Sequence, residues 1–290
     1  LMDARSIAAT AANKGYLTAA TDVDVEFTNP TYHFDKTIYE NRVFDSKGVA
    51  DPSVEIKFGP NIKDWPEQVA LTDNILVKVV SEIHDPVTTT DELIPSGETS
   101  SYRSNPLGLA EFTLSRKDPA YVGLAKEMRA AEEVRRSGAD VTESNAEVAR
   151  AFKVIKEAYP ELNVAETEIG STIFAVKPGD GSAREQAASC QRVLGGLANI
   201  ANEYATKRYR SNLINWGLIP FIIDEGELPF KNGDFIFIPD AVKAIRDKLS
   251  EVKAYVVKDK LCEFTLKIGE LTDDERQIIL DGCLINYYRH

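Results

Sequence analysis

Several residue types that metal centres and nucleophilic triads require are scarce in this sequence of 290 residues. It contains three cysteines and three histidines, and Cys190, Cys262 and Cys283 form no C-x-x-C pair. A histidine-rich metal site or a Ser-His-Asp triad therefore has little raw material. The dispersed cysteines predict reduced thiols with a packing role, as in a cytoplasmic protein.

Basic residues are in the minority as well. Lys and Arg total 34 against 46 Asp and Glu, which gives a net charge of -12. Such a surface repels phosphate backbones and anionic lipids, so we expect neither a nucleic-acid partner nor a membrane partner. No run of about 18 apolar residues is present, which argues against a membrane-spanning helix. The remaining composition, 43% hydrophobic and 28% charged, is typical of a soluble globular protein.

The beginning of the chain has a different pattern from the rest. Residues 3–21 favour a short packed helix that ends near Gly15. Residues 21–73 are interrupted by Pro and Gly every few positions, which predicts an irregular linker that packs on something through Trp65. The sequence also begins without Met and enters the helix at once, which predicts a piece of a longer polypeptide.

From residue 75 onward, strand and helix signals alternate, which predicts an α/β fold. Helices are expected to begin at Asp118–Pro119 and at two capping boxes, Ser144–Glu147 and Thr272–Glu275. The polar loop 85–106 is long for a compact domain, which favours a functional role. β-branched or alternating runs predict strands at 75–83, 171–176, 218–223, 235–238, 254–257 and 263–268.

Residues 179–187, GDGSAREQA, connect a predicted strand to a predicted helix. Gly179 and Gly181 allow a sharp turn and close approach of a ligand to the backbone. The helix N-terminus adds unpaired N–H groups, which suit a carboxylate or a phosphate, and Arg184 adds a bidentate clamp. Ser182 stands at the mouth of the turn. The same spacing also fits an ordinary glycine turn in which Ser182 caps the helix.

Three segments in order resemble the aconitase family. The GDGSAREQA turn is similar to the Gly-Glu-Gly-Ser-Ser-Arg-Glu-His-Ala stretch of that family's swivelling domain, and residues 204–221 are similar to its Asn-Leu and Gly-Leu-Leu-Pro stretch. Residues 89–97, TTDELIPSG, are similar to its Thr-Thr-Asp-His-Ile-Ser-Pro-Ala-Gly loop. Arg103 follows Asp91 by twelve positions, the family's spacing.

The resemblance implies a fold and a division of the chain. Residues 75–290 are expected to form a swivelling β/β/α domain of the aconitase C-terminal type. Residues 1–74 are expected to be the end of the large catalytic region followed by a linker. The Arg-rich helical stretch at about 118–160 is most similar to a bacterial branch called hydratases.

The resemblance also implies roles for individual residues. Ser182 corresponds to the general base, and Arg184 and Arg103 to arginines that bind substrate carboxylates. Asp91 would orient the loop or Arg103, although it also suits a simple turn cap. Ala183, which replaces the family's second serine, lies at a substrate-binding position without its hydroxyl.

A further departure is Gln186, where the family has a histidine.

Family members bind a [4Fe-4S] cluster through three cysteines of the large catalytic region, and the cysteines here do not match that spacing. No cofactor is therefore expected in this fragment, and the cluster is expected in the full-length protein.

These implications predict the C-terminal part of a hydro-lyase that dehydrates and rehydrates a hydroxy di- or tricarboxylic acid, with citrate/isocitrate isomerisation first. Its partners would be that small-molecule hydroxy acid and the missing N-terminal catalytic region of the same polypeptide, so the fragment alone should be inactive. The alternative is a non-catalytic anion-binding or regulatory module, which Ala183 favours. RNA binding by a cluster-free form fits poorly with the acidic charge.

Overall fold

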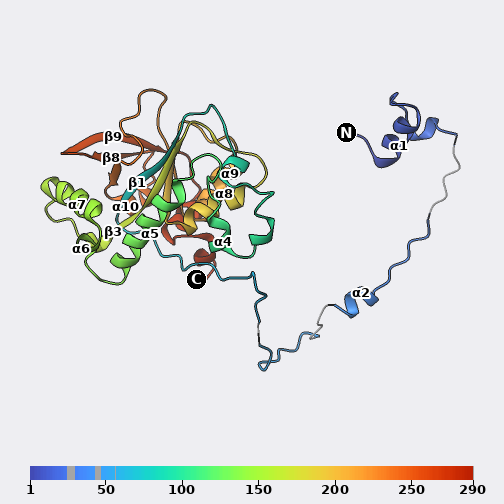
Figure 1. Ribbon diagram of the computed structural model, residues 1–290, viewed down its shortest axis with the longest axis horizontal. Helices are drawn as coiled ribbons and strands as arrows, with labels where there is room; N and C mark the ends of the chain where they lie inside the picture. The colour runs from blue at the N-terminus through green and yellow to red at the C-terminus, as the bar shows by residue number, and fades with distance from the viewer. Residues whose placement is uncertain (25–29, 43–46, 56, 290) are drawn as a thin grey trace. The chain divides into compact units, whose positions relative to one another are not determined.

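The computed structural model describes residues 1–24, 30–42, 47–55 and 57–289, and the chain divides into two units, residues 1–57 and 58–290 (Figure 1). The first unit contains α1 (Ala4–Ala12), a 3-10 turn η1 (Ala20–Asp22) and the short α2 (Thr37–Glu40). Asp3 caps α1 by accepting hydrogen bonds from the backbone N–H groups of Arg5 and Ser6. The predicted helix is therefore present. The expected packing of this helix is wrong, because its large apolar residue Ile7 is 53% exposed and Ala9 is the residue of α1 that is buried.

The second unit is built around a barrel. Within the described residues, the strands close in the order β1-β3-β5-β6-β9-β8-β7. Strands β1, β3, β5 and β6 pair in parallel, and the other pairings are antiparallel. The strands are β1 (Asn74–Ile83), β3 (Thr167–Ala175), β5 (Gly196–Ala201), β6 (Ile219–Ile222), β7 (Phe235–Ile238), β8 (Glu251–Val257) and β9 (Leu261–Ile268).

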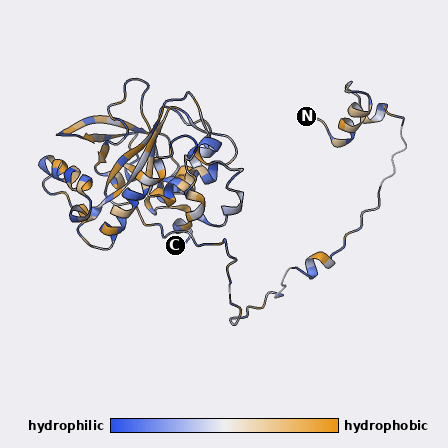
Figure 2. Ribbon diagram, in the orientation of Figure 1, coloured by the Kyte–Doolittle hydropathy of each residue, from blue (hydrophilic) through white to orange (hydrophobic). Residues whose placement is uncertain are grey.

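Burial along the strands follows from how their faces are covered. Helices lie outside β1 and β3, so nearly every residue of these strands is buried. Strand β8 alternates between exposed and buried positions, and Figure 2 shows hydrophilic and hydrophobic residues along it. The predicted strands are confirmed. Strand β5 was not predicted, because its sequence GLANIA has only one β-branched residue.

Most of the predicted helix signals are also confirmed. Helix α5 (Tyr121–Arg136) stops before Gly138, which has φ of +79°. Helix α11 (Asp273–Leu280) begins with the predicted capping box. The predicted box at Ser144 is wrong, because Ser144 ends the short α6 (Val141–Ser144). Helix α7 (Ala146–Ala158) is capped instead by Asn145, whose side chain accepts two backbone N–H groups.

The other helices are short and complete the cover of the barrel. Helices α4, α8 and α9 pack over one part of the sheet in a single apolar cluster, and α5, α6 and α7 pack over another. They are α3 (Thr90–Leu93), α4 (Pro106–Ala110), α8 (Arg184–Val193), α9 (Lys207–Asn215), α10 (Ala241–Arg246) and α12 (Leu284–Tyr287), with 3-10 turns η2 (Ser100–Tyr102) and η3 (Val164–Glu166).

The segment before β1 packs on the second unit, as the sequence predicted. The Trp65 ring lies 4.3 Å from the ring of Trp216, measured between centroids. The Leu71 N–H donates a hydrogen bond to the Leu280 carbonyl. The assignment of residues 1–74 to a preceding catalytic region stays a prediction. No helix in the described part of the chain is both long and apolar enough to cross a bilayer.

Candidate active site

A small second sheet brings two distant segments together. Strand β2 (Thr88–Thr89) pairs in parallel with β4 (Pro178–Asp180). Strand β2 leads directly into α3, where Thr89 and Glu92 form a reciprocal capping box. The pairing therefore places the polar loop 85–106 against the glycine turn. No signal in the sequence predicted strands this short.

The turn requires glycine at both predicted positions. Gly179 has φ of +99°, and a Cβ there would lie 2.3 Å from the Tyr209 ring. Gly181 has φ of +133°, and a Cβ there would lie 2.1 Å from the Thr90 hydroxyl oxygen. The ring of Tyr209 is held in place, because its hydroxyl accepts hydrogen bonds from Gln191 and Asn199 at 3.0 and 2.9 Å. The sequence predicted that a ligand would approach these glycines, whereas the groups that lie against them in the structure are protein side chains.

Ser182 does not cap α8. The N-cap is Ala183, whose side chain makes no capping hydrogen bond. Ser182 lies one residue earlier and is exposed, and its hydroxyl has no hydrogen-bond partner among the described residues. The interpretation of Ser182 as an ordinary cap is therefore wrong. The first N–H groups of α8 lack a side-chain acceptor and leave a partial positive charge at this end of the helix.

Ser182 and Arg103 line the same cavity, which has a volume of about 250 Å³. Arg103 comes from the end of η2 and is exposed, whereas Ser182 comes from the glycine turn. The other lining residues are Ile94, Ser96, Thr99, Leu109, Ala183 and Gln186. Sequence reasoning did not select Ser96 or Thr99. Both lie in the long polar loop, and Ser96 also lies in the 89–97 segment that resembles the family's loop.

The remaining two candidates lie beside this cavity without lining it. Arg184 is half-buried, and its Nε is fully buried without a hydrogen-bond partner. Asp91 forms an ion pair with Arg116 at 3.1 Å and accepts the Ser96 N–H at 3.1 Å. Asp91 thus holds the loop that carries the cavity wall, and it makes no contact with Arg103 within the described residues.

The charge distribution suits an anionic ligand. Arg116 pairs with both Asp91 and Glu98, so its charge is compensated within the loop. Arg103 and Arg184 form no ion pair with any described residue. The uncompensated guanidinium group of Arg103 therefore lines the same cavity as the Ser182 hydroxyl, next to the N-terminus of α8. This arrangement can bind carboxylates and can stabilise negative charge that develops near Ser182.

The cysteines have no part in this site. Cys190 and Cys283 are buried, and burial raises the pKa of the Cys190 thiol, which disfavours the thiolate that metal binding requires. The described residues contain no group of three or more His, Cys, Asp or Glu side chains placed to hold a metal ion. This part of the chain therefore does not fit an iron-sulfur cluster.

Part of the chain matches a known protein family. Residues 128–226 match the family model described as aconitase C-terminal domain. This stretch of the chain is therefore similar to an aconitase C-terminal domain. The matched residues include the glycine turn, Ser182 and Arg184, and they exclude Asp91 and Arg103. The aconitase-family resemblance and the mixed α/β fold drawn from the sequence are thereby confirmed.

The domain is also similar to a solved structure, a 3-isopropylmalate dehydratase from Methanocaldococcus jannaschii. The two are 24% identical, and the match covers 74% of this chain and 93% of that chain with a TM-score of 0.44. No curated protein matches this chain.

Proposed function

We propose that this chain is part of a hydro-lyase that acts on a hydroxy di- or tricarboxylic acid. The observation that carries the proposal is the shared cavity, in which the unpartnered Ser182 hydroxyl and the uncompensated Arg103 meet beside the N-terminus of α8. Citrate/isocitrate isomerisation is the first substrate pair to test.

Ser182 is proposed as the general base that removes a proton from the carbon next to a substrate carboxylate. A neutral serine is a weak base, so its alkoxide needs a strongly positive environment. Arg103, Arg184 and the free N–H groups of α8 supply that environment. The negative charge that the substrate gains on losing the proton is stabilised by the same groups.

The arginines are proposed to bind carboxylates. Arg103 already lines the cavity. Arg184 begins α8 next to Ala183, and its buried Nε has no hydrogen-bond partner, so it is the candidate for binding a second carboxylate. Ala183 presents a methyl group to the cavity where the resembling family has a hydroxyl, so one hydrogen bond to the substrate is missing. Asp91 is proposed to set the position of the loop.

The other partner is proposed to be the N-terminal catalytic region of the same polypeptide, of which residues 1–74 would include the end and the linker. The first unit supports this, because large hydrophobic side chains such as Leu17, Tyr32 and Phe34 are exposed on it. The [4Fe-4S] cluster and a cytoplasmic location belong to this same proposal. The fragment alone is expected to be inactive.

The proposal is tested by replacing Ser182 in the full-length protein. Turnover of a panel of hydroxy acids is followed by the ultraviolet absorbance of the unsaturated intermediate. Ser182→Ala should lower kcat by about 10²–10⁴-fold with little change in substrate binding. Arg103→Lys and Arg184→Lys should mainly weaken binding, because lysine lacks the bidentate geometry. Ser250→Ala, at an exposed serine far along the chain, is the matched control. Unchanged turnover in Ser182→Ala would remove Ser182 from the mechanism.

A non-catalytic anion-binding module is the second candidate, and Ala183 is the residue that favours it. It predicts that the full-length protein binds citrate without producing an absorbing intermediate. It also predicts that Arg103→Lys weakens binding while Ser182→Ala has no effect on any measured property.

A further inference from the structure

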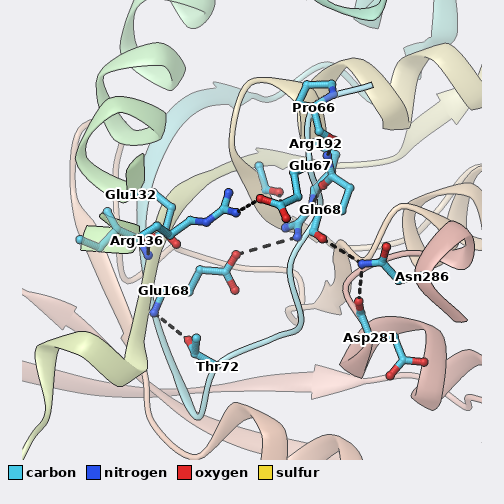
Figure 3. Close-up of polar contacts among 12 residues, drawn as sticks. Pro66, Glu67, Gln68, Thr72, Glu132, Arg136, Glu168, Arg192, Asp281 and Asn286 are labelled. Carbon is cyan, nitrogen blue, oxygen red and sulfur yellow. Dashed lines mark hydrogen bonds and ion pairs between the residues drawn. The ribbon is translucent and has the colours of Figure 1, made fainter. Parts of the chain in front are cut away.

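A second cavity lies at the other end of α8, away from the candidate active site. Its volume is about 270 Å³, slightly below the size of typical drug-sized pockets. Four parts of the second unit contribute to it: the segment 66–69, helix α5, the beginning of β3 and the end of α8 with the residues that follow it. Figure 3 shows the polar contacts made by several of its lining residues, among them Glu132, Glu168 and Arg192.

A buried carboxylate with one unpartnered oxygen lies in this cavity. Glu168 is 2% exposed, and its Oε1 lies 3.9 Å from the nearest Arg192 nitrogen. Its Oε2 is buried and has no hydrogen-bond partner among the described residues. The close-up shows the Glu168 side chain extending toward Arg192 and Gln68 (Figure 3). A buried carboxylate oxygen without a donor is costly, so this position favours a ligand that brings one.

The neighbouring charged groups are satisfied by protein. Glu132 accepts hydrogen bonds from Arg135 and from the Ile169 N–H. Arg192 donates to the Gln68 side chain at 2.8 Å and to the Gly196 carbonyl. Glu168 Oε2 is therefore unpartnered beside two charged groups that are held by hydrogen bonds within the protein.

Two arginines that line the cavity, Arg136 and Arg129, add positive charge to it. Arg136 pairs with Glu67 at 2.6 Å through one nitrogen, and the Glu67 side chain is largely exposed. Arg129 bonds Glu133 and the Val193 carbonyl through two of its nitrogens. Each of these two arginines keeps guanidinium N–H groups outside these bonds. The apolar residues that line the cavity are Val69, Ile169, Val193 and Leu197.

We propose that this cavity binds a small aliphatic α-amino acid. The ligand's ammonium group donates to Glu168 Oε2, and its carboxylate accepts hydrogen bonds from Arg136 and Arg129 at the rim. The aliphatic side chain lies against the apolar residues that line the cavity. A zwitterion matches this arrangement because a free carboxylate oxygen and free guanidinium N–H groups line one small cavity.

Binding should depend on pH through Glu168. The pKa of Glu168 is raised to about 7, mainly by burial and also by Glu132 of α5, against the opposing effects of Arg192 of α8 and Arg135 of α5. The Thr72 hydroxyl faces the Glu168 N–H from the preceding segment. Because the ammonium group binds the ionised carboxylate, affinity should increase about tenfold between about pH 6 and pH 8.

The test is calorimetric titration of the whole chain with three probes: L-valine, isobutylamine, which lacks the carboxylate, and isovalerate, which lacks the ammonium group. L-valine should bind and should raise the thermal midpoint of unfolding by about 2–4 °C when it is well above its Kd. The two partial ligands should each bind at least tenfold more weakly.

Two variants test the contacts to the ammonium group and to the carboxylate of the ligand separately. Glu168→Gln should weaken L-valine binding at least tenfold and remove the pH dependence. Should that variant fail to fold, Arg136→Gln at the exposed rim should weaken L-valine binding about tenfold and leave isobutylamine binding unchanged. Arg150→Gln, an exposed arginine outside the cavity, is the matched control.

The outcomes decide the proposal. Loss of L-valine affinity in the cavity variants but not in the control supports it. No L-valine binding, or binding that is equal in wild type and in the folded cavity variants, overturns it and assigns Oε2 to a buried water. Equal binding of isobutylamine and L-valine overturns the amino-acid assignment in favour of a simple amine.

Discussion

The two ends of α8 carry cavities of similar size whose charged residues differ in how far they are paired within the protein. At the N-terminal end, Ser182 and Arg103 line a cavity of about 250 Å³ and have no protein partner among the described residues. At the C-terminal end, Arg192 is buried and bonds Gln68 and Gly196 beside a cavity of about 270 Å³. At the N-terminal end Arg103 has no ion-pair partner, whereas at the C-terminal end most charged groups are paired within the protein.

The difference shows that the burial of a charged residue decides whether it mainly binds a ligand or mainly stabilises the fold. A charged group that is exposed contributes little to folding and can be left unpaired for a substrate. A buried charge has to be compensated, so its removal affects the folded state first. The following predictions compare the two ends, from the largest expected effect to the smallest.

The largest effect is expected from Arg192→Met. It removes the cation that faces Glu168 and the tie between α8 and Gln68. The free energy of unfolding, measured with urea, should fall by about 3–5 kcal/mol. The control is Arg136→Met at an ion pair whose partner Glu67 is largely exposed, where the loss should be at most about 1 kcal/mol. Equal losses in the two variants would contradict the contrast between buried and exposed pairs.

Glu168 should also make stability depend on pH. Its pKa is raised from 4.5 to about 7 by burial, so the folded state binds this proton more tightly than the unfolded state. Its contribution is therefore fully present below pH 4.5 and is lost as the pH rises through about 7. The loss amounts to about 3 kcal/mol.

Unfolding of wild type and Glu168→Gln across this pH range measures that contribution. The wild type should lose stability relative to the variant as the pH rises, because the amide does not ionise. A difference between the two proteins that stays constant with pH would show that Glu168 does not titrate in this range.

A smaller effect is expected from Gly181→Ala in the glycine turn. The new Cβ would lie 2.1 Å from the Thr90 hydroxyl oxygen, so the loop and the turn must move apart, at a cost of about 1–3 kcal/mol. Gly226→Ala is the matched control, because Gly226 also has a positive φ but no atom lies within 4 Å of the position that a Cβ would take there. Thermal unfolding of both variants isolates the clash. Equal destabilisation would mean that Gly181 is needed for its backbone angle alone.

The smallest effect on stability is expected from Ser182→Ala and Arg103→Ala. Neither side chain has a protein partner among the described residues, so the free energy of unfolding should change by less than about 0.5 kcal/mol. Urea unfolding of the two variants checks this. A loss above about 1 kcal/mol in either variant would show a structural role for that residue.

Local signals in the sequence determined much of this domain. The β-branched run of β1, the four-residue strand β7 and the capping box at Thr272 were predictable, because each depends on residues that are neighbours in the chain. The glycine turn was predictable for the same reason. At Ser144 two local signals competed, and the side chain of Asn145 made the better cap.

The tertiary structure alone decided which of these local pieces meet. The two-residue strand β2 pairs with β4 and so brings Arg103 to Ser182, while Arg184 and Asp91 turn aside. The buried position of Glu168 likewise depends on α5, α8 and the segment before β1 packing around it. Such contacts join residues far apart in sequence, and they are set by the packing of the whole barrel and its helices, which no short pattern records.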